Sequence, residues 1–575
     1  MPERCAYMFK SYFLKEKYKK LLLTSSVANG VNMILAVIDS FIAGNNFGEN
    51  GIAAVTLVAP LYSVALCVGG MITEGGGLMY ARAAGEHDKK RMDELFSESL
   101  ILAAIAGVIL LLLSFTCGDL YFRTYSDAPN ALAYAKEYYS YYRVIFGIVP
   151  IQFYLSRIVF NDGDGKFCMI SYFTRVCVSI IVSVTACRAI GIKGIGIGEL
   201  AGILASFIPL FLHFAKKVYS HKLVFFLSKK DIPNILKYSV SDALNYLYGG
   251  IVTVTLNNVI LANFGESYLC IYALVGNLLN VEHFIDGIGG AMYPMIETFM
   301  GEKNLAAQKK VLKYSAEAVY LEGAICAAVI GIFAPSIVKL LGVEDPHIVP
   351  LCISAVRIVG IPIIGYALGI YISSYYILCE RIVLATVLTC LSNAILPVVL
   401  CSIAGSRLGI NGLWYIIGLS PLFSVILVEV FVLIRYGKKQ FPYIYPDYGN
   451  VSKSYEFTLT EENAVSFRDD VEKVLIENNV EKKRRFKLLL LCEEIPLLIH
   501  EKNDKRLLME CSLLIGEKVN LIFRDDGESF DLTDEDMDIT SLRSYILSRI
   551  MSFSRENVSM LTTSYNRNII YTLDE

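Results

Sequence analysis

The sequence lacks the closely spaced cysteines from which zinc sites and disulfide frameworks are built. Its 14 cysteines occur singly and mostly within apolar stretches, as at Cys67, Cys177 and Cys326. Cysteines distributed in this way are typical of small core residues, so they predict no metal site. A basic excess is also missing, since 52 Lys and Arg face 55 Asp and Glu. That balance excludes the electrostatic footprint of a nucleic-acid-binding protein.

Two sequence signals are absent as well. No G-x-x-x-x-G-K-[ST] phosphate loop occurs in the polar C-terminal part, which argues against energy coupling of the ABC or ATP synthase type. The basic N-terminus is not followed by a short apolar stretch with a small-residue cleavage site. We therefore expect the first long apolar segment to be retained as a membrane anchor.

Apolar residues are present in excess: 55% of the chain is hydrophobic, and its mean hydropathy is +0.51. A soluble protein does not need so many to fill its core, so the surplus is expected to face lipid. Crossing about 30 Å of hydrocarbon takes roughly 20 apolar residues. The sequence thus predicts an all-α polytopic membrane protein. Its twelve predicted transmembrane helices lie at 21–43, 52–75, 98–118, 138–160, 168–190, 194–215, 238–263, 268–295, 315–342, 351–378, 382–404 and 410–436.

Basic residues near the ends of these spans predict the orientation of the chain, because Lys and Arg are retained on the cytoplasmic side. They gather before the first span, after the second, between the sixth and seventh, after the eighth and after the twelfth. Both termini are therefore predicted to be cytoplasmic, in a multi-pass protein of the cell (inner) membrane.

An internal duplication relates the two sets of six spans, at an offset of roughly 212 to 218 residues. The turn Gly85-Glu86-His87-Asp88 corresponds to Gly301-Glu302-Lys303-Asn304, and Pro150 corresponds to Pro362. Duplicated halves of this kind are typical of transporters with a cleft between two bundles. The predicted parts are a cytoplasmic tail, an N-lobe, a cytoplasmic linker and a C-lobe, at residues 1–20, 21–215, 216–236 and 237–436.

Three short segments of the first repeat stand out: Asp39-Ser40-Phe41-Ile42-Ala43-Gly44, Gly51-Ile52-Ala53-Ala54-Val55 and Ala81-Arg82-Ala83-Ala84-Gly85. Together they resemble the MATE (multidrug and toxic compound extrusion) family, over about residues 20–436. The resemblance implies an antiporter coupled to Na⁺ or H⁺ that exports small amphipathic or cationic organic compounds by alternating access. It implies no enzymatic activity, and the expected partners are a small-molecule substrate and membrane lipids.

Ionisable residues inside membrane spans are costly, so each is a functional candidate. Asp39, in the first span, matches the acidic N-lobe position that the MATE family uses for proton or sodium coupling, as the resemblance implies. In the alternative interpretation, Asp39 only bonds neighbouring helices through Asn29 or Asn32.

The eighth predicted span holds a second candidate group. Glu282 and Asp286 are four residues apart and so lie on one helical face, with His283 beside them. We expect this group to hold a cation or a cationic substrate, unless it lies at a solvated helix end. Weaker candidates, as internal pairs or interfacial residues, are Glu74, Glu199, Glu317, Glu322, Arg175 and Arg357.

The fifth span departs from the MATE pattern, because many members carry an Asn and an Asp there, whereas Ser179-Ile180-Ile181-Val182-Ser183-Val184-Thr185 contains neither. Two other classes of function therefore stay open. One is a flippase for lipid-linked precursors, which would favour a strongly basic cleft. The other is a membrane sensor that signals through the C-terminal part.

After residue 437 the chain becomes polar, with 26 acidic and 19 basic residues over 437–575. Residues 454–575 are predicted to form a cytoplasmic α/β sandwich. Strands are expected at 455–459, 507–514 and 518–524 and in two closing segments, with helices at 461–478, 481–500 and 541–553.

Two segments of this domain, Asp525-x-Gly527-x-x-Phe530-Asp531 and Thr562–Asn568, resemble the GHKL ATPase fold in its anti-sigma-factor-kinase branch. The resemblance implies nucleotide-binding candidates at Glu494, Asp525 and Gly527, although Asp and Gly also favour a simple turn. The magnesium-ligating Asn of that family is replaced by Leu498, and the glycine-rich lid is missing. We therefore expect no ATP hydrolysis, leave ATP binding open, and predict a regulatory or docking module with a possible cytoplasmic protein partner.

Overall fold

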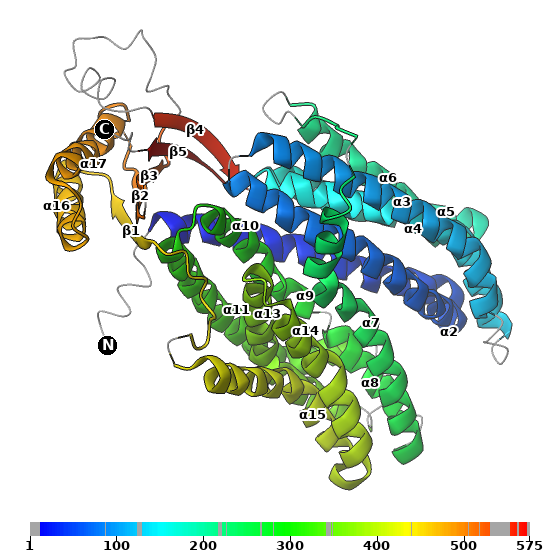
Figure 1. Ribbon diagram of the computed structural model, residues 1–575. Helices are drawn as coiled ribbons and strands as arrows, with labels where there is room; N and C mark the ends of the chain where they lie inside the picture. Colours follow the sequence, from blue (N-terminus) through cyan, green and yellow to red (C-terminus); the bar gives the residue numbers. More distant parts are fainter. Residues whose placement is uncertain are drawn as a thin grey trace.

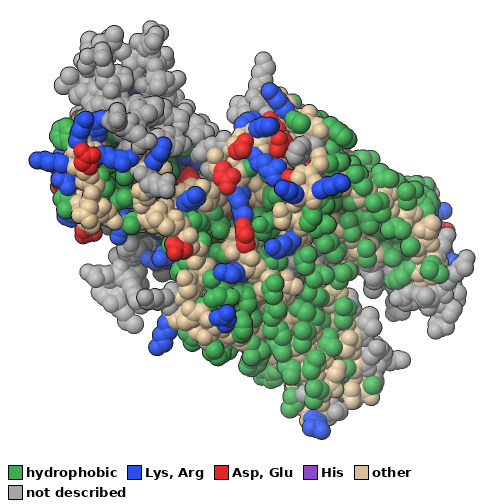
Figure 2. Space-filling model, viewed as in Figure 1, with side chains coloured by type: hydrophobic (Ala, Val, Ile, Leu, Met, Phe, Trp, Pro, Cys, Tyr) green, Lys and Arg blue, Asp and Glu red, His purple; other side chains and the backbone are tan. Residues whose placement is uncertain are grey.

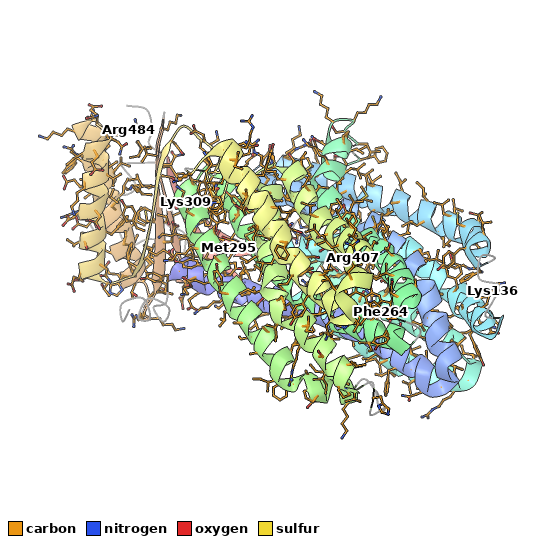
Figure 3. The ribbon with its side chains drawn as sticks, turned by 90° about the horizontal axis from the view of Figure 1, so that it is seen from below. Lys136, Phe264, Met295, Lys309, Arg407 and Arg484 are labelled. Carbon is orange, nitrogen blue, oxygen red and sulfur yellow. The ribbon has the colours of Figure 1, made fainter. Side chains whose placement is uncertain are left out.

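The computed structural model describes residues 12–86, 88–122, 129–216, 221–225, 227–264, 267–279, 281–340, 347, 349–438, 440–503, 505–516, 518–528, 553–560 and 563–571. Two helical lobes meet beside a smaller C-terminal domain and diverge away from it (Figure 1). Figure 3 places Lys309 beside that domain and Lys136 at the opposite end of the lobes. We call these two ends the domain end and the far end.

The helices of the N-lobe are α2 (Phe13–Gly85), α3 (Lys89–Phe122), α4 (Pro129–Asn161), α5 (Gly165–Ile190) and α6 (Lys193–Phe214). Although α2 spans 73 residues, its chain reverses near Gly51. A Cβ on Gly51 would lie 2.5 Å from the carbonyl oxygen of Ala43, whereas a straight helix separates residues eight positions apart by about 12 Å. This hairpin accounts for the first two predicted spans.

The C-lobe is less regular. Its helices are α7 (Asp231–Asn263), α8 (Ser267–Leu279), α9 (Glu282–Ile285), α10 (Gly287–Gly301), α11 (Leu305–Leu340), α12 (Val349–Gly360), α13 (Ile364–Leu378), α14 (Ile382–Cys390) and α15 (Leu396–Tyr436), with a 3₁₀ turn at Ile361–Ile363 and a π-helical turn at Leu391–Ile395. Gly409, with φ of 68°, kinks α15. The eighth predicted span, 268–295, is divided among α8, α9 and α10, although Val281 and Asp286 at the divisions keep right-handed helical backbone.

Within the described part of the chain, nine helices are long and apolar enough to cross a membrane. They coincide with the second to sixth and the ninth to twelfth predicted spans. Hydrophobic side chains cover the visible surface of the lobes, and charged side chains gather at the domain end (Figure 2). This division is expected of a protein whose lobes lie in lipid.

The C-terminal domain contains an antiparallel sheet in the order β1-β2-β3-β5-β4. Its elements are β1 (Val451–Thr458), α16 (Glu461–Glu477), α17 (Lys482–Glu501), β2 (Leu508–Ile515), β3 (Val519–Asp525), β4 (Phe553–Met560) and β5 (Thr563–Tyr571). The helix predicted at 541–553 lies outside the described residues, apart from its last position, where β4 begins. Thr460 caps α16 by accepting a hydrogen bond from the backbone N–H of Asn463, as N-cap threonines do.

The two faces of this sheet differ in chemistry, because side chains alternate along each strand. Met509, Cys511 and Leu513 of β2 face α16 and α17 and form an apolar core with them. The residues between them, Glu510 and Ser512, are also fully buried, but against the helical lobes. The sheet is thus covered on both sides.

Candidate functional site

Asp39 lies on α2 in the interior of the N-lobe, with only 7% of its surface exposed. The Tyr138 side chain of α4 lies near its carboxyl group. The charged groups of Glu199 on α6 and Arg175 on α5 act on Asp39 electrostatically. Four helices therefore direct ionisable or hydroxyl side chains to one buried place, which we call the N-lobe site.

Arg175 and Glu199 form an internal ion pair in this site. The guanidinium Nη2 of Arg175 lies 3.3 Å from Glu199 Oε2 and donates a hydrogen bond of 3.2 Å to the Tyr62 hydroxyl. Ser179 donates a hydrogen bond of 2.6 Å to Glu199 Oε1. Both charged residues are buried, and a pair this deep needs such additional hydrogen bonds to offset its desolvation.

Glycines on α6 explain how Glu199 reaches α5. A Cβ on Gly198 would collide with the Ser183 side chain, and one on Gly202 would lie 2.7 Å from the Arg175 carbonyl oxygen. Small residues at these positions let the two helices approach closely. Glu199 therefore contacts Ser179 within the segment that lacks the Asn and Asp of the MATE pattern, so the carboxylate comes from the next helix instead.

With both carboxyl groups ionised, the charges of the N-lobe site would not balance. Two carboxylates, Asp39 and Glu199, face one guanidinium, Arg175, among the described residues. A buried charge without compensation is strongly unfavourable. One bound cation or one proton would therefore make the site electrically neutral.

The second predicted group lies in the C-lobe, away from Asp39. Glu282 borders a cavity of ≈ 10 Å³, room for about one water molecule. Asp286 Oδ1 accepts a hydrogen bond of 3.0 Å from the Tyr366 hydroxyl. The backbone N–H of Asp286 bonds to the Glu282 carbonyl, which keeps the predicted spacing within a helical turn, whereas the side chain of His283 lies outside the described residues. The structure does not bring this group together with Asp39.

At the domain end the two lobes are in contact. Arg82 of α2 pairs with Glu380 of the C-lobe at 2.8 Å and lies over the Tyr238 ring of α7. Arg157 of α4 lies over the Tyr293 ring of α10, 5.3 Å from its centroid. The ends of the lobes beside the C-terminal domain are thus held closed.

The weaker candidates have ordinary partners. Glu74 pairs with Arg157 at 3.3 Å, and Glu317 pairs with Lys15 at 3.0 Å. Glu322 accepts a hydrogen bond from Ser26, and Arg357 donates one to the Gly331 carbonyl. Of the residues ranked below Asp39 by sequence, only Arg175 and Glu199 join the N-lobe site.

In the C-terminal domain, two of the predicted nucleotide-binding residues form a hydrogen-bonded turn. Asp525 Oδ1 accepts from the Gly527 N–H at 3.0 Å and from Asn566 Nδ2 at 2.9 Å. Glu494 lies on α17. Asn503, just after the end of that helix, accepts a hydrogen bond from the Glu528 N–H in the same turn as Gly527. These contacts fit the turn-forming role of Asp525 and Gly527.

A row of charged residues crosses the second face of the sheet. Strand register places Glu456, Glu510, Arg524 and Arg567 side by side on β1, β2, β3 and β5. Glu510 pairs with Arg524 within the domain. The strand register places Glu556 of β4 opposite Arg567, but the two adjacent arginines repel each other unless a further negative charge lies between them.

That negative charge comes from the C-lobe. Glu302, in the turn between α10 and α11, pairs with Arg524 and lies 3.2 Å from Arg567. Its side chain is only 3% exposed. Asn304 of the same turn donates a hydrogen bond of 2.6 Å to Ser512. We call this set of contacts the docking cluster.

Glu456 extends the docking to the start of α2 and to α11. It accepts hydrogen bonds from the Leu14 N–H at 2.8 Å and from the Tyr314 hydroxyl at 3.0 Å, and it pairs with Lys310 at 2.9 Å. The corresponding turn of the N-lobe is different, because Glu86 is exposed. The C-terminal domain therefore buries Glu302 in one copy of the duplicated turn, whereas Glu86 in the other copy stays exposed.

Comparisons with known proteins agree with this architecture. A family model described as MatE matches residues 25–185. The chain is 21% identical over 359 residues to the multidrug export protein MepA of Staphylococcus haemolyticus, covering 61% of this chain and 78% of that protein. It is 21% identical over 348 residues to the probable multidrug resistance protein YoeA of Bacillus subtilis, with 56% and 72% covered.

A solved structure extends the likeness to both lobes. It is the outward-facing conformation of a multidrug resistance MATE family transporter of the MOP superfamily, with a TM-score of 0.68 and 20% sequence identity. The match covers 73% of this chain and 95% of that chain. The fold of the lobes is thus that of a membrane transporter. Within that class it is the MATE fold, as the sequence resemblance predicts.

Proposed function

We propose that this protein is a cation-coupled exporter of small amphipathic or cationic organic compounds. The observation that carries the proposal is the charge imbalance of the N-lobe site, where Asp39 and Glu199 share one guanidinium, Arg175. A proton or a sodium ion bound beside Asp39 would remove the imbalance. Its binding and release would then favour different arrangements of the lobes, which is the requirement for coupling an ion to a substrate.

Two further features support export by alternating access. The lobes are held together at the domain end and diverge toward the far end (Figure 1), as expected of an outward-facing transporter. Relatives of similar sequence are named as multidrug export and resistance proteins. Tyrosine rings border the N-lobe site, with Tyr138 and Tyr142 4.8 Å apart and Tyr62 5.4 Å from Tyr142, and aromatic faces attract organic cations.

We also propose that the C-terminal domain regulates the C-lobe rather than hydrolysing ATP. The docking cluster ties the domain to the turn between α10 and α11, and Glu456 ties it to the start of α2, so the domain contacts both lobes. Leu498, at the position where the GHKL family has its magnesium ligand, is buried in the apolar core between α17 and the sheet. A buried leucine offers no oxygen to Mg²⁺.

The test of the transport proposal uses the full chain in proteoliposomes loaded with a fluorescent organic cation. An imposed Na⁺ or H⁺ gradient is expected to drive dye efflux, and dissipating the correct gradient with an ionophore is expected to stop it. Gradient-independent movement of fluorescent lipid would support a flippase instead. If neither the dye nor the lipid moves, the transport proposal is contradicted, and a membrane sensor is the remaining candidate function.

Replacing Arg82 with glutamine is expected to weaken closure at the domain end, because Glu380 loses its partner across the lobes. The pair is partly exposed, so we expect about 1 kcal/mol at most, which is roughly a fivefold shift in the lobe equilibrium. Electron–electron double resonance between spin labels on the two lobes measures it. Lys19→Gln, which breaks a pair within α2, should leave the distances unchanged, and unchanged distances in both variants would contradict the role of Arg82.

A further inference from the structure

Two histidines and an aspartate meet where the N-lobe joins the linker. Asp162 follows α4, His213 is near the end of α6, and His221 lies in the linker after α6. The exposed fractions of their side chains are 5%, 0% and 5%. Two segments about 50 residues apart in sequence therefore bring together residue types that bind transition metals, in a place that excludes most solvent.

The ligand atoms converge on one point. Asp162 Oδ2 lies 2.9 Å from His213 Nε2 and 2.7 Å from His221 Nε2, and all three atoms lie within 4.8 Å of one another. Around a tetrahedral ion with bonds of about 2.0 Å, neighbouring ligand atoms lie about 3.3 Å apart. Small movements of the Asp162 carboxylate away from the rings would open the space that such an ion needs.

The surrounding contacts hold these side chains in place. Tyr80 donates a hydrogen bond of 2.6 Å to the other oxygen of Asp162. Asp164 Oδ2 lies 3.1 Å from His213 Nδ1, and the Phe96 ring stacks on His221 at 4.8 Å. A carboxylate on the distal nitrogen of a histidine, and a hydrogen bond to a ligating carboxylate, are the outer contacts typical of metal sites.

The hydrogen-bonding capacity of His213 points to a cation. Its two ring nitrogens both face carboxylate oxygens, of Asp162 and Asp164, but a neutral imidazole has one N–H to donate. The second contact requires either a proton or a metal ion at Nε2. His221 adds a second nitrogen to the same oxygen, which favours an ion that several ligands can share.

We propose that Asp162, His213 and His221 bind a divalent transition-metal ion of the zinc type and thereby fasten the linker to the N-lobe. Two imidazoles and one carboxylate suit Zn²⁺, Co²⁺ or Ni²⁺, with water as the fourth ligand. Mg²⁺ and Ca²⁺ prefer oxygen ligands and are disfavoured. The proposal does not depend on the transported substrate, because the cluster is separate from the N-lobe site.

The test uses the full-length protein, purified in detergent and stripped of metal. Titration with Co²⁺ is expected to give visible absorption of a tetrahedral complex, saturating at one ion per chain, and Zn²⁺ should displace it. Loss of an outer hydrogen-bonding carboxylate typically weakens metal binding about 10- to 100-fold, so Asp164→Asn should fall in that range. His213→Gln and His221→Gln, which remove ligands, should each weaken binding by more than about 100-fold.

His347→Gln is the matched control, because His347 is exposed between α11 and α12, and it should bind Co²⁺ like the wild type. His221 is buried and hydrogen-bonded to Asp162, so the thermal unfolding of metal-free His221→Gln is compared with that of the metal-free wild type to separate lost stability from lost metal binding. Substoichiometric binding, or equal binding by the wild type and both ligand variants, would overturn the proposal and leave a proton-bridged hydrogen-bond network.

Discussion

Replacing Asp39 with asparagine is expected to abolish gradient-driven dye efflux. The amide keeps the size of the side chain and its contact with Tyr138 but removes one of two carboxylates that face Arg175. With Glu199 alone remaining, the N-lobe site is neutral without any bound cation. A neutral site does not attract the driving cation, so efflux should fall to the rate measured without a gradient. The rates are compared in proteoliposomes that contain equal amounts of protein.

Glu199→Gln offers the complementary experiment. It also removes one negative charge but leaves Arg175 beside Asp39, so the same neutrality and loss of coupling are expected. Glu137→Gln, on an exposed part of α4, is the matched control and should transport normally. Full coupling in Asp39→Asn would contradict the assignment of this residue, whatever the transported compound.

Replacing Glu302 with glutamine is expected to release the C-terminal domain from the C-lobe. Arg524 would then pair with Glu510 alone, and Arg567 would lose its ion pair with the C-lobe. Removing one partner of a buried ion pair costs about 3–5 kcal/mol. Hydrogen exchange should report faster exchange in the turn between α10 and α11 and on β3 and β5, with the helices of the N-lobe unchanged.

Glu86→Gln is a close control, because Glu86 occupies the corresponding turn of the N-lobe and is exposed. It should leave hydrogen exchange and efflux as they are in the wild type. If the domain regulates transport, Glu302→Gln changes the efflux rate whereas Glu86→Gln does not. An unchanged rate with a released domain would contradict regulation while leaving the docking itself intact.

The membrane spans could be predicted largely from sequence, because lipid imposes one condition on every residue that faces it. Segments of apolar residues with the right length therefore coincide with nine of the described helices. The divisions among α8, α9 and α10 within the eighth predicted span could not be predicted, because local composition does not report them. Its apolar residues continue past Leu279, while Gly287, Gly289 and Gly290 lie beside Ser26, Ser374 and Ser25 of neighbouring helices.

The N-lobe site could be predicted only in part. Asp39 is conspicuous as a lone acid within an apolar segment, but its neighbours Arg175 and Glu199 are 24 residues apart and come from two helices. No spacing rule connects them before the packing of α5 on α6 is known. One signal was available, since glycines at Gly198 and Gly202 on α6 indicate a close helix contact.

Neither the docking cluster nor the group of Asp162, His213 and His221 could be predicted from the sequence, for a related reason. Glu302 and Arg524 are 222 residues apart in the chain, and Asp162 is 59 residues from His221. Each residue alone resembles an ordinary charged or polar residue in a loop or strand. Their chemistry appears only when the lobes, the linker and the sheet are assembled.

The composition of the second face of the sheet determines what the C-terminal domain would expose if it separated from the lobes. Where Glu510, Arg524 and Arg567 are buried, the contact between the domain and the lobes contains charged groups that water also solvates well. The same face of the sheet carries the apolar cluster of Leu514, Ile522 and Ile569. A domain that separated from the lobes would therefore expose charged groups as well as apolar ones. We expect a separated domain to aggregate less readily than one whose exposed face consisted only of leucines and phenylalanines.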